Sequence, residues 1–150
     1  MNKYEIVELT LADLPKCSSF WGYPNARLEE FLKSGSRKVF AYRTGDEYVG
    51  GCALIVPAKK SLVVSFFSLL RGKIQLGHFS DFFVREDLRG RGIGSHILEF
   101  AIDYFKEKGI KKIRLHVDKD NPAIRLYTKY GFKHFEDMTP EKIAMIKDII

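Results

Sequence analysis

Residues 89–94 read Arg89-Gly90-Arg91-Gly92-Ile93-Gly94, and this stretch decides the fold because three alternating glycines join two regular elements. The residues before it, 79–84, have the composition of a strand. After it, apolar residues recur at helical spacing, at Ile93, Ile97, Leu98, Ala101, Ile102 and Phe105. Glycines let the backbone turn tightly and expose consecutive N–H groups, and a helix start adds unpaired donors. The stretch therefore predicts a strand, a turn that binds an anionic diphosphate, and a helix.

The spacing of the glycines separates this turn from other nucleotide-binding motifs. The dinucleotide pattern G-x-G-x-x-G fails, because its last glycine would fall on Ser95 or Ile97. The P-loop pattern G-x-x-x-x-G-K-[ST] occurs nowhere in the sequence. The pattern [RQ]-x-x-G-x-[GA] is met by Arg89, Gly92 and Gly94. Taken alone, this short pattern leaves open a glycine-rich turn that binds nothing.

A second stretch, 121–132, reads Asn121-Pro122-Ala123-Ile124-Arg125-Leu126-Tyr127-Thr128-Lys129-Tyr130-Gly131-Phe132. Residues 84–94 and this stretch resemble two signatures of the GNAT superfamily of acyl-CoA-dependent N-acetyltransferases, in the family's order and at its separation. The resemblance is sharp from Gly77 to Phe132. It implies an α/β (α+β) fold, with helices flanking a mixed and partly splayed central sheet, and a single domain over residues 1–150.

Composition agrees with one globular domain. The chain has 150 residues, 45% of them hydrophobic, and a chain of this length buries roughly 70% of its unfolded surface. Cys17 and Cys52 show no metal-ligand or C-x-x-C spacing, so we expect no metal. No secretory leader pattern precedes Tyr4, and the longest apolar stretch, 62–70, is far too short for a membrane span. These features predict a cytoplasmic protein that does not engage a membrane.

The formal charge of +6 raises the question of a nucleic-acid partner. Most basic residues stand beside acidic ones, as in Lys106-Glu107-Lys108, and no basic run alternates with aromatic residues. A polyanionic cofactor would account for Arg85, Arg89 and Arg91. The sequence therefore favours a small anionic cofactor over a nucleic acid.

The chain before the glycine loop reads as strands and helices without repeats. We expect a strand over 4–9, a helical turn over 10–14 capped by Thr10, a helix from Asn25 to Gly35, and a hairpin of strands 38–43 and 48–56. Residues 58–73 could be strand, helix or a loop that covers the substrate. Phe20, Trp21 and Tyr23 form an aromatic cluster that could contact the substrate or belong to the core.

After the glycine loop the pattern predicts a helix ending at Lys108 and Gly109, a strand over 111–117, and a short helix from Pro122 to Gly131. Thr139-Pro140-Glu141 looks like a helix start, and Ile143, Ile146 and Ile150 follow at helical spacing. We therefore expect a helical C-terminus in place of the family's usual last strand. A missing strand could then be supplied by another subunit in a homodimer.

The resemblance implies a reaction in which a primary amine attacks the thioester of acetyl-CoA directly and CoA is released, with no covalent enzyme intermediate. It implies that the diphosphate lies on the loop formed by Arg89, Gly90, Arg91, Gly92, Ile93, Gly94 and Ser95. It also implies that the main chain of Phe82, Phe83 and Val84 pairs with the pantetheine arm, as an added strand would. Asn121 and Tyr127 complete the expected cofactor-binding set. Asp120 could occupy the asparagine's place instead, because the spacing to the tyrosine is one residue shorter than usual.

Three residues are candidates for catalysis. By resemblance Tyr127 is the general acid toward the CoA sulfur, although a tyrosine at this helical position could equally be core. His78 and His116 stand where family members carry the base, and imidazole titrates near the working pH. Each could instead be a structural histidine. Asp81, on the opposite strand face from His78 by alternation, is a candidate to bind the substrate ammonium or to act as a buried hydrogen-bond acceptor.

Three functional classes remain open, of which a nucleic-acid-associated protein that uses the basic surface is the least favoured. The first is an N-acetyltransferase acting on a small amine, an amino acid or a protein N-terminus. The second is a regulatory protein that binds acyl-CoA and has lost the chemistry. Tyr127 and two candidate bases favour the enzyme.

Overall fold

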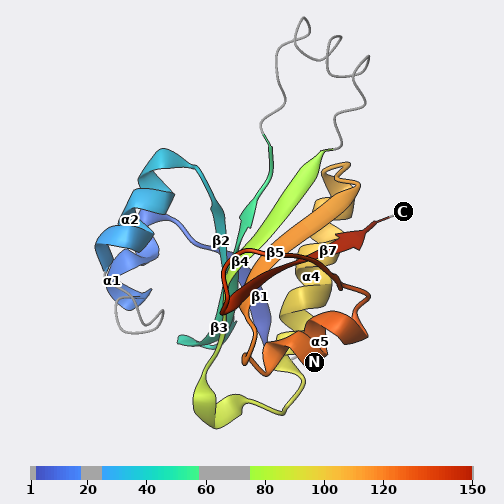
Figure 1. Ribbon diagram of the computed structural model, residues 1–150. Helices are drawn as coiled ribbons and strands as arrows, with labels where there is room; N and C mark the ends of the chain where they lie inside the picture. The colour runs from blue at the N-terminus through green and yellow to red at the C-terminus, as the bar shows by residue number, and fades with distance from the viewer. Residues whose placement is uncertain (1–2, 18–24, 58–74, 150) are drawn as a thin grey trace, which may run out of the picture. The chain divides into compact units, whose positions relative to one another are not determined.

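The computed structural model of the chain describes residues 3–17, 25–57 and 75–149 (Figure 1). The predictions for residues 58–73 and for Phe20, Trp21 and Tyr23 lie outside these ranges. The described strands form one sheet in the order β1-β2-β3-β4-β5-β7-β6, and helices accompany it, so the predicted α/β class is confirmed. The chain divides into two compact units, residues 1–55 with 79–101 and residues 56–78 with 102–150.

The first unit holds the N-terminal strands and the glycine loop. Its elements are β1 (Glu5–Glu8), a 3-10 turn (Leu11–Asp13), α1 (Leu14–Cys17), α2 (Asn25–Ser34), β2 (Lys38–Thr44), β3 (Glu47–Ile55), most of β4 (Leu76–Val84), a 3-10 turn (Glu86–Leu88) and the first part of α4 (Ile93–Glu107). Strands β1 and β2 pair antiparallel, as do β2 and β3. The predicted cap, helix and hairpin are all present.

Local chemistry explains these elements. The Asp13 carboxylate accepts hydrogen bonds from the backbone N–H and hydroxyl of Thr10, both at 2.8 Å, and so secures the turn that Thr10 begins. Helix α2 turns Leu28 and Phe31 into a core with Val39, Ala41 and Ala53 of the hairpin strands. These small and β-branched residues allow a helix to pack closely on the strands.

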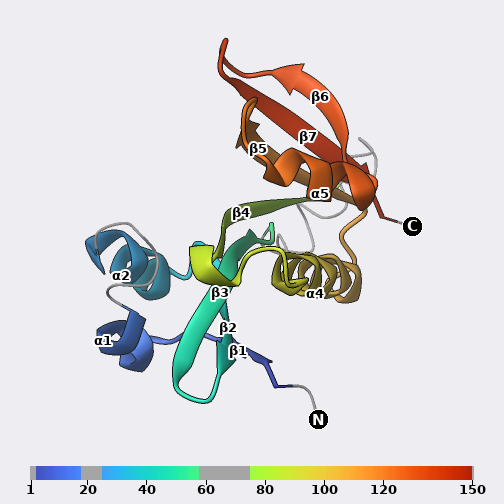
Figure 2. The ribbon, with the colours of Figure 1, turned by 90° about the horizontal axis from the view of Figure 1, so that it is seen from below.

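The second unit holds the rest of β4 and α4 together with β5 (Lys112–Asp118), α5 (Ala123–Lys129), β6 (Lys133–Asp137) and β7 (Lys142–Asp148). Strand β7 lies between β5 and β6 and is antiparallel to both (Figure 2). On β5, Ile113, Leu115 and Val117 are buried, whereas the alternate residues are not. Strand β5 therefore buries one face only, as period-2 alternation predicts.

The predicted helical C-terminus is wrong, because residues 142–148 form strand β7. The apolar run 143–146 is bounded by Lys142 and Lys147 and is too short for periodicity to distinguish a buried strand from a helix. Pairing on both edges with β5 and β6 decides in favour of the strand. The chain therefore supplies this strand itself, and the expectation that a second subunit could supply a missing strand no longer applies.

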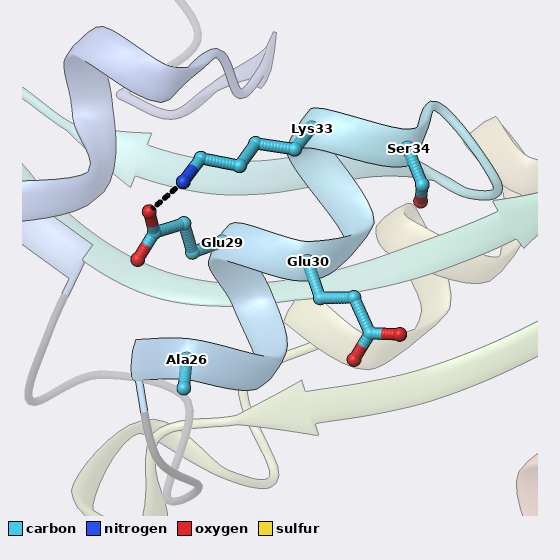
Figure 3. Close-up of a pocket in the computed structure, with 5 residues that line it drawn as sticks. All are labelled: Ala26, Glu29, Glu30, Lys33 and Ser34. Atoms are coloured by element: carbon cyan, nitrogen blue, oxygen red, sulfur yellow. Dashed lines mark ion pairs between the residues drawn. The ribbon is translucent and has the colours of Figure 1, made fainter.

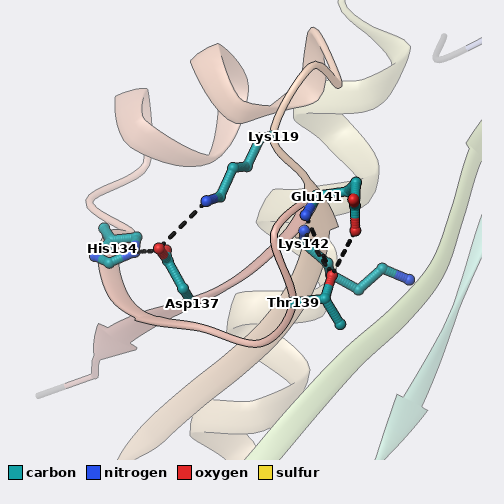
Figure 4. A network of polar contacts seen from close by, with 6 residues as sticks. All are labelled: Lys119, His134, Asp137, Thr139, Glu141 and Lys142. Atoms are coloured by element: carbon teal, nitrogen blue, oxygen red, sulfur yellow. Dashed lines mark hydrogen bonds and ion pairs between the residues drawn. The ribbon is translucent and has the colours of Figure 1, made fainter.

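Thr139-Pro140-Glu141 forms the turn between β6 and β7 rather than a helix start (Figure 4). The Thr139 hydroxyl oxygen accepts hydrogen bonds from the N–H groups of Glu141 (3.3 Å) and Lys142 (3.1 Å). Met138 N–H donates to the Lys142 carbonyl at 2.8 Å, which closes the hairpin. Threonine caps turns and helices with the same hydroxyl bonds, so the pattern alone did not separate them.

Among the described helices, none combines the length and the apolar character that crossing a bilayer requires.

Candidate cofactor and catalytic sites

The glycine loop has the conformation that its sequence predicts. Gly90 and Gly92 have φ values of 75° and 82°, which residues with a Cβ adopt only under strain. The Gly92 carbonyl accepts a hydrogen bond from His96 N–H at 3.1 Å, so helix α4 begins directly after this glycine. The N–H groups that follow have no acceptor within the helix. N–H groups in this arrangement are able to bind an anion, as at other helix N-termini.

The loop is also open. Residues 89–92 are exposed, and a Cβ atom placed on Gly90 or Gly92 would meet no heavy atom within 4 Å. These glycines are therefore not required by close packing of the protein against itself. A space beside exposed backbone N–H groups is what a diphosphate needs, and the residues present fit that group.

Arg85, shortly before the loop, and Arg89, within it, make polar contacts with other parts of the first unit. Arg89 donates from Nε to the Val84 carbonyl at 3.0 Å and so ties the loop to the end of β4. Arg85 binds Asp87 at 2.7 Å and Glu47 at 3.5 Å. The hydrogen bonds between Arg85 and Asp87 raise the pKa of the arginine and lower that of the carboxyl. Arg85 is thus engaged with acidic side chains of the protein.

The end of β4 presents its main chain in two directions. Arg85 N–H donates to the Val49 carbonyl of β3 at 2.9 Å, and a Cβ atom on Gly50 would lie 2.8 Å from the Phe83 carbonyl oxygen. Residues 83 and 85 therefore direct backbone groups toward β3. By alternation, Phe82 and Val84 direct theirs away from it. Of the three residues predicted to pair with pantetheine, these two have the suitable direction.

Asp81 lies in β4 with a φ of 51°. Arg37 donates from Nη1 to its Oδ2 at 2.6 Å, and the Ser80 hydroxyl donates to the same oxygen at 2.9 Å. The carboxylate predicted to recognise a substrate ammonium thus already has a cationic partner within the chain.

In the second unit, the two histidines predicted as alternative bases lie together. The ring centroids of His78 and His116 are 4.7 Å apart, and the rings meet edge to face at 83°. Arg114 donates from Nε to His116 Nε2 at 3.1 Å. Because an arginine always donates, this bond requires a neutral His116 that carries its proton on Nδ1.

The surroundings of His116 favour that neutral form. Partial loss of hydration and the positive charges of Arg114 and Lys142 lower the pKa of His116, while Glu136 opposes them. Glu136 pairs with Arg114, whose Nη2 also lies 3.3 Å from the Met138 sulfur. The arginine is therefore held from β6 while it contacts the histidine.

Tyr127 and Asn121 belong to the same unit. Tyr127 is buried, and its ring meets that of Phe132 at 5.9 Å. The Asn121 side-chain oxygen accepts a hydrogen bond from Ala123 N–H at 2.9 Å, which caps the short helix α5. Asn121 therefore fixes the start of the helix that carries Tyr127.

The predicted site residues fall into two sets. The first unit contains the loop residues 89–95, the three residues 82–84 and Asp81. The second unit contains His78, His116, Asn121 and Tyr127. Sequence reasoning missed Arg37 and Arg114. Arg114 stands two residues from His116 on one strand face, and that spacing could have revealed it. Arg37 is 44 residues from Asp81 and gave no local signal.

A separate hollow lies along helix α2 and is lined by Ala26, Glu29, Glu30, Lys33 and Ser34 (Figure 3). Glu29 and Lys33 pair with each other one helical turn apart. Within the described parts of the chain, no group of three or more His, Cys, Asp or Glu residues is placed to hold a metal ion.

Comparison with known proteins gives a family. A family model described as the acetyltransferase (GNAT) family matches residues 5–132. An uncharacterised N-acetyltransferase of Methanocaldococcus jannaschii is 37% identical over 78 residues, which are 51% of this chain and 34% of that protein. A mycothiol acetyltransferase of Corynebacterium aurimucosum is 42% identical over 53 residues, 35% of this chain and 17% of that protein. The chain thus spans about a third or less of the length of these relatives.

Solved structures share the fold over nearly the whole chain. Arabidopsis thaliana NAA60 in complex with acetyl-CoA has a TM-score of 0.75 at 18% identity, covering 97% of this chain and 98% of that one. The ribosomal-protein-S18-alanine N-acetyltransferase of Escherichia coli has a TM-score of 0.72 at 19% identity, covering 97% and 94%. At these identities the likeness concerns the fold.

Proposed function

Because this chain belongs to the GNAT family of acetyltransferases, we propose that it transfers the acetyl group of acetyl-CoA directly to a primary amine. The observation that carries the proposal is the open glycine loop, with Gly90 and Gly92 at positive φ and a helix starting directly after it. We take residues 1–150 as one domain in this function.

The loop would hold acetyl-CoA by its diphosphate. Backbone N–H groups from Gly90 to Ser95 supply donors, and the positive end of the α4 dipole adds attraction for an anion. Arg89 and Arg91 bring positive charge to the same exposed loop. Phe82 and Val84 of β4 would pair with the pantetheine amides through their main chain. The cofactor supplies an activated acetyl thioester, and the loop positions it.

An amine acceptor must lose a proton before it attacks, because an ammonium has no free electron pair. We propose that the pair His78 and His116 provides the base, directly or through water. The lowered pKa of His116 favours the neutral imidazole at neutral pH, which is the form that accepts a proton. Because neutral His116 carries its proton on Nδ1 and its Nε2 accepts from Arg114, His116 would act as the base only once Nε2 leaves that hydrogen bond.

The amine nitrogen forms a bond to the acetyl carbon, the carbon–sulfur bond breaks, and the sulfur leaves as a thiolate that needs a proton. Tyr127 is the proposed donor. Its burial suits a phenol that must keep its proton until the sulfur takes it, and the capped start of α5 at Asn121 holds it in place. Asn121 is then a positioning residue as well as a candidate contact to the cofactor.

The acceptor class is tested with an amine panel. Purified protein is incubated with acetyl-CoA and small amines, amino acids and peptides with free N-termini, and free CoA thiol is measured together with acceptor mass. We expect thiol release that requires one acceptor class and adds one acetyl group to it. Cys17 and Cys52 are both buried, so the chain adds little thiol background. Binding of acetyl-CoA without transfer to any acceptor would instead identify a regulatory acyl-CoA-binding protein.

A further inference from the structure

Strand β4 contains a backbone conformation that its sequence does not favour. Asp81 has a φ of 51°, and it is the one non-glycine residue at positive φ within the described ranges. Such residues are strained and persist only where the surroundings hold them. The strain occurs directly before Phe82 and Val84, whose main chain is proposed to pair with pantetheine.

The strain changes the direction of the strand's side chains. In a regular strand, residues three apart point to opposite faces. The rings of Phe79 and Phe82 nevertheless meet at 5.5 Å between centroids. Burial along β4 alternates as far as Ser80 and then stops alternating. The conformation at Asp81 therefore shifts the faces of the strand by one residue before the predicted cofactor edge begins.

A network around Arg37 holds this conformation. Arg37 Nη1 lies 2.6 Å from Asp81 Oδ2 and 2.8 Å from Ser80 Oγ, and the Ser80 hydroxyl lies 2.9 Å from the same carboxylate oxygen. The guanidinium also stacks on the Phe31 ring at 4.4 Å from its centroid. Arg37, the residue before β2, thus contacts Phe31 of α2 and both Ser80 and Asp81 of β4.

The ion pair between Arg37 and Asp81 is largely buried, which makes each charge depend on the other. The side chains of Arg37 and Asp81 are 24% and 12% exposed, so each has lost much of its water. A charge in that position is costly without its partner, and a carboxylate bonded by a guanidinium and a hydroxyl has little freedom to turn. The Asp81 carboxylate therefore fixes its own backbone, and Arg37 fixes the carboxylate.

We propose that Arg37 and Asp81 are positioning residues for acetyl-CoA: their ion pair holds the left-handed turn in β4 that directs the main chain of Phe82 and Val84 toward the pantetheine arm. This inference rests on the proposed function. It assigns Asp81 to the shape of the cofactor edge instead of to recognition of the acceptor amine.

The test uses two double variants that differ by one methyl group. Arg37→Met/Asp81→Gly and Arg37→Met/Asp81→Ala both lack the ion pair and any buried unpaired charge. Glycine adopts positive φ freely, whereas alanine does not. We expect calorimetry to show CoA binding by the glycine variant about tenfold tighter than by the alanine variant. Equal affinities for the two would overturn the proposal.

Steady-state kinetics separate positioning from acceptor recognition. For Asp81→Ala we expect the KM for acetyl-CoA to rise while the KM for the amine stays within about twofold. For Asp81→Gly we expect much of the acetyl-CoA KM to be regained. If both variants instead raise the amine KM equally and leave that of acetyl-CoA unchanged, Asp81 binds the acceptor and the proposal is wrong.

A third measurement needs no cofactor. Arg37→Lys keeps the charge but removes the planar guanidinium that stacks on Phe31 and bonds Ser80 and Asp81. In the free protein we expect its backbone amide signals at residues 81–84 to move together. Changes confined to the neighbours of residue 37 would contradict the inference. A parent protein that fails to bind CoA while its Arg37→Lys variant shows these shifts would disprove the proposed function and leave the backbone role of the pair intact.

Discussion

The glycine loop of the first unit and the histidine–tyrosine set of the second differ in the groups that the proposed function assigns to them. The loop offers main-chain N–H groups that glycines expose, and a Cβ on Gly92 would meet no heavy atom of the described residues beyond its chain neighbours within 4 Å. The proposed second set consists of side chains whose state depends on nearby charges, as the pKa of His116 depends on Arg114 of the same strand and on Lys142 of β7. Cofactor binding should therefore be sensitive to backbone freedom, and turnover to charge and hydrogen bonding.

The largest expected effect is loss of CoA binding when the glycine loop is changed. Gly92→Val should abolish CoA binding, because the branched side chain is strained at a φ of 82° and fills space that the diphosphate needs. Calorimetry with CoA measures it. Gly45→Val is the matched control, since Gly45 also has a positive φ and open surroundings but lies in the hairpin turn. Unchanged CoA affinity in a folded Gly92→Val protein would show that the loop is not the diphosphate site.

Tyr127→Phe should act on turnover while nearly preserving acetyl-CoA affinity. If the phenol protonates the leaving thiolate, kcat falls by roughly tenfold to thousandfold. Tyr130→Phe, at the residue directly after the same helix, controls for loss of a hydroxyl. An unchanged kcat with some loss of stability would make Tyr127 a core residue, which would remove the general acid from the second set.

The pH dependence of the rate should distinguish His78 from His116 as the base. Replacing the base by alanine should flatten the dependence of rate on pH near neutrality and move the optimum to higher pH, where more amine is already deprotonated. We expect this behaviour from His78→Ala or from His116→Ala, and from one of them only. Parent-like profiles in both variants would mean that neither imidazole accepts the proton.

Arg114→Gln tests whether His116 is the base by shifting its pKa while leaving the imidazole in place. Removing the guanidinium charge should raise the pKa of His116 toward the ordinary value of about 6.5, which an NMR titration of its ring protons measures. If His116 is the base, more of it is then protonated at pH 6, so kcat/KM there falls and the acid limb moves to higher pH. A shifted NMR titration with an unmoved limb would assign the base to another group.

The smallest effect concerns the network beside the second set. Asp137 accepts hydrogen bonds from His134 at 2.8 Å and Lys119 at 3.2 Å, which lower its pKa (Figure 4). A carboxyl group whose pKa is lowered by folding stabilises the folded state at pH values above its unfolded pKa of about 3.9. This contribution is lost as the pH falls through the pKa of the folded state. Asp137→Asn should therefore lower Tm slightly at pH 7 and by less at pH 2. An equal loss at both values would indicate a cause other than charge.

Sequence reasoning succeeded where the decisive residues are close together in the chain. The loop at Gly92, the hairpin at Gly45 and the helix start at Asn121 each depend on a few consecutive residues with restricted backbone choices. It failed at β7, because the run 143–146 fits a helix or a strand until its partners are known. The alternation rule also failed at Asp81, whose conformation depends on an arginine 44 residues away.

The central claim is that backbone N–H groups of the glycine loop hold the CoA diphosphate, and an NMR titration of the backbone amides with CoA tests it most directly. The account predicts that the signals of residues 90–95 move first and furthest, and that 3′,5′-ADP, which carries the nucleotide but lacks the diphosphate bridge to pantetheine, moves them less. CoA binding that leaves these signals in place while shifting others would contradict it.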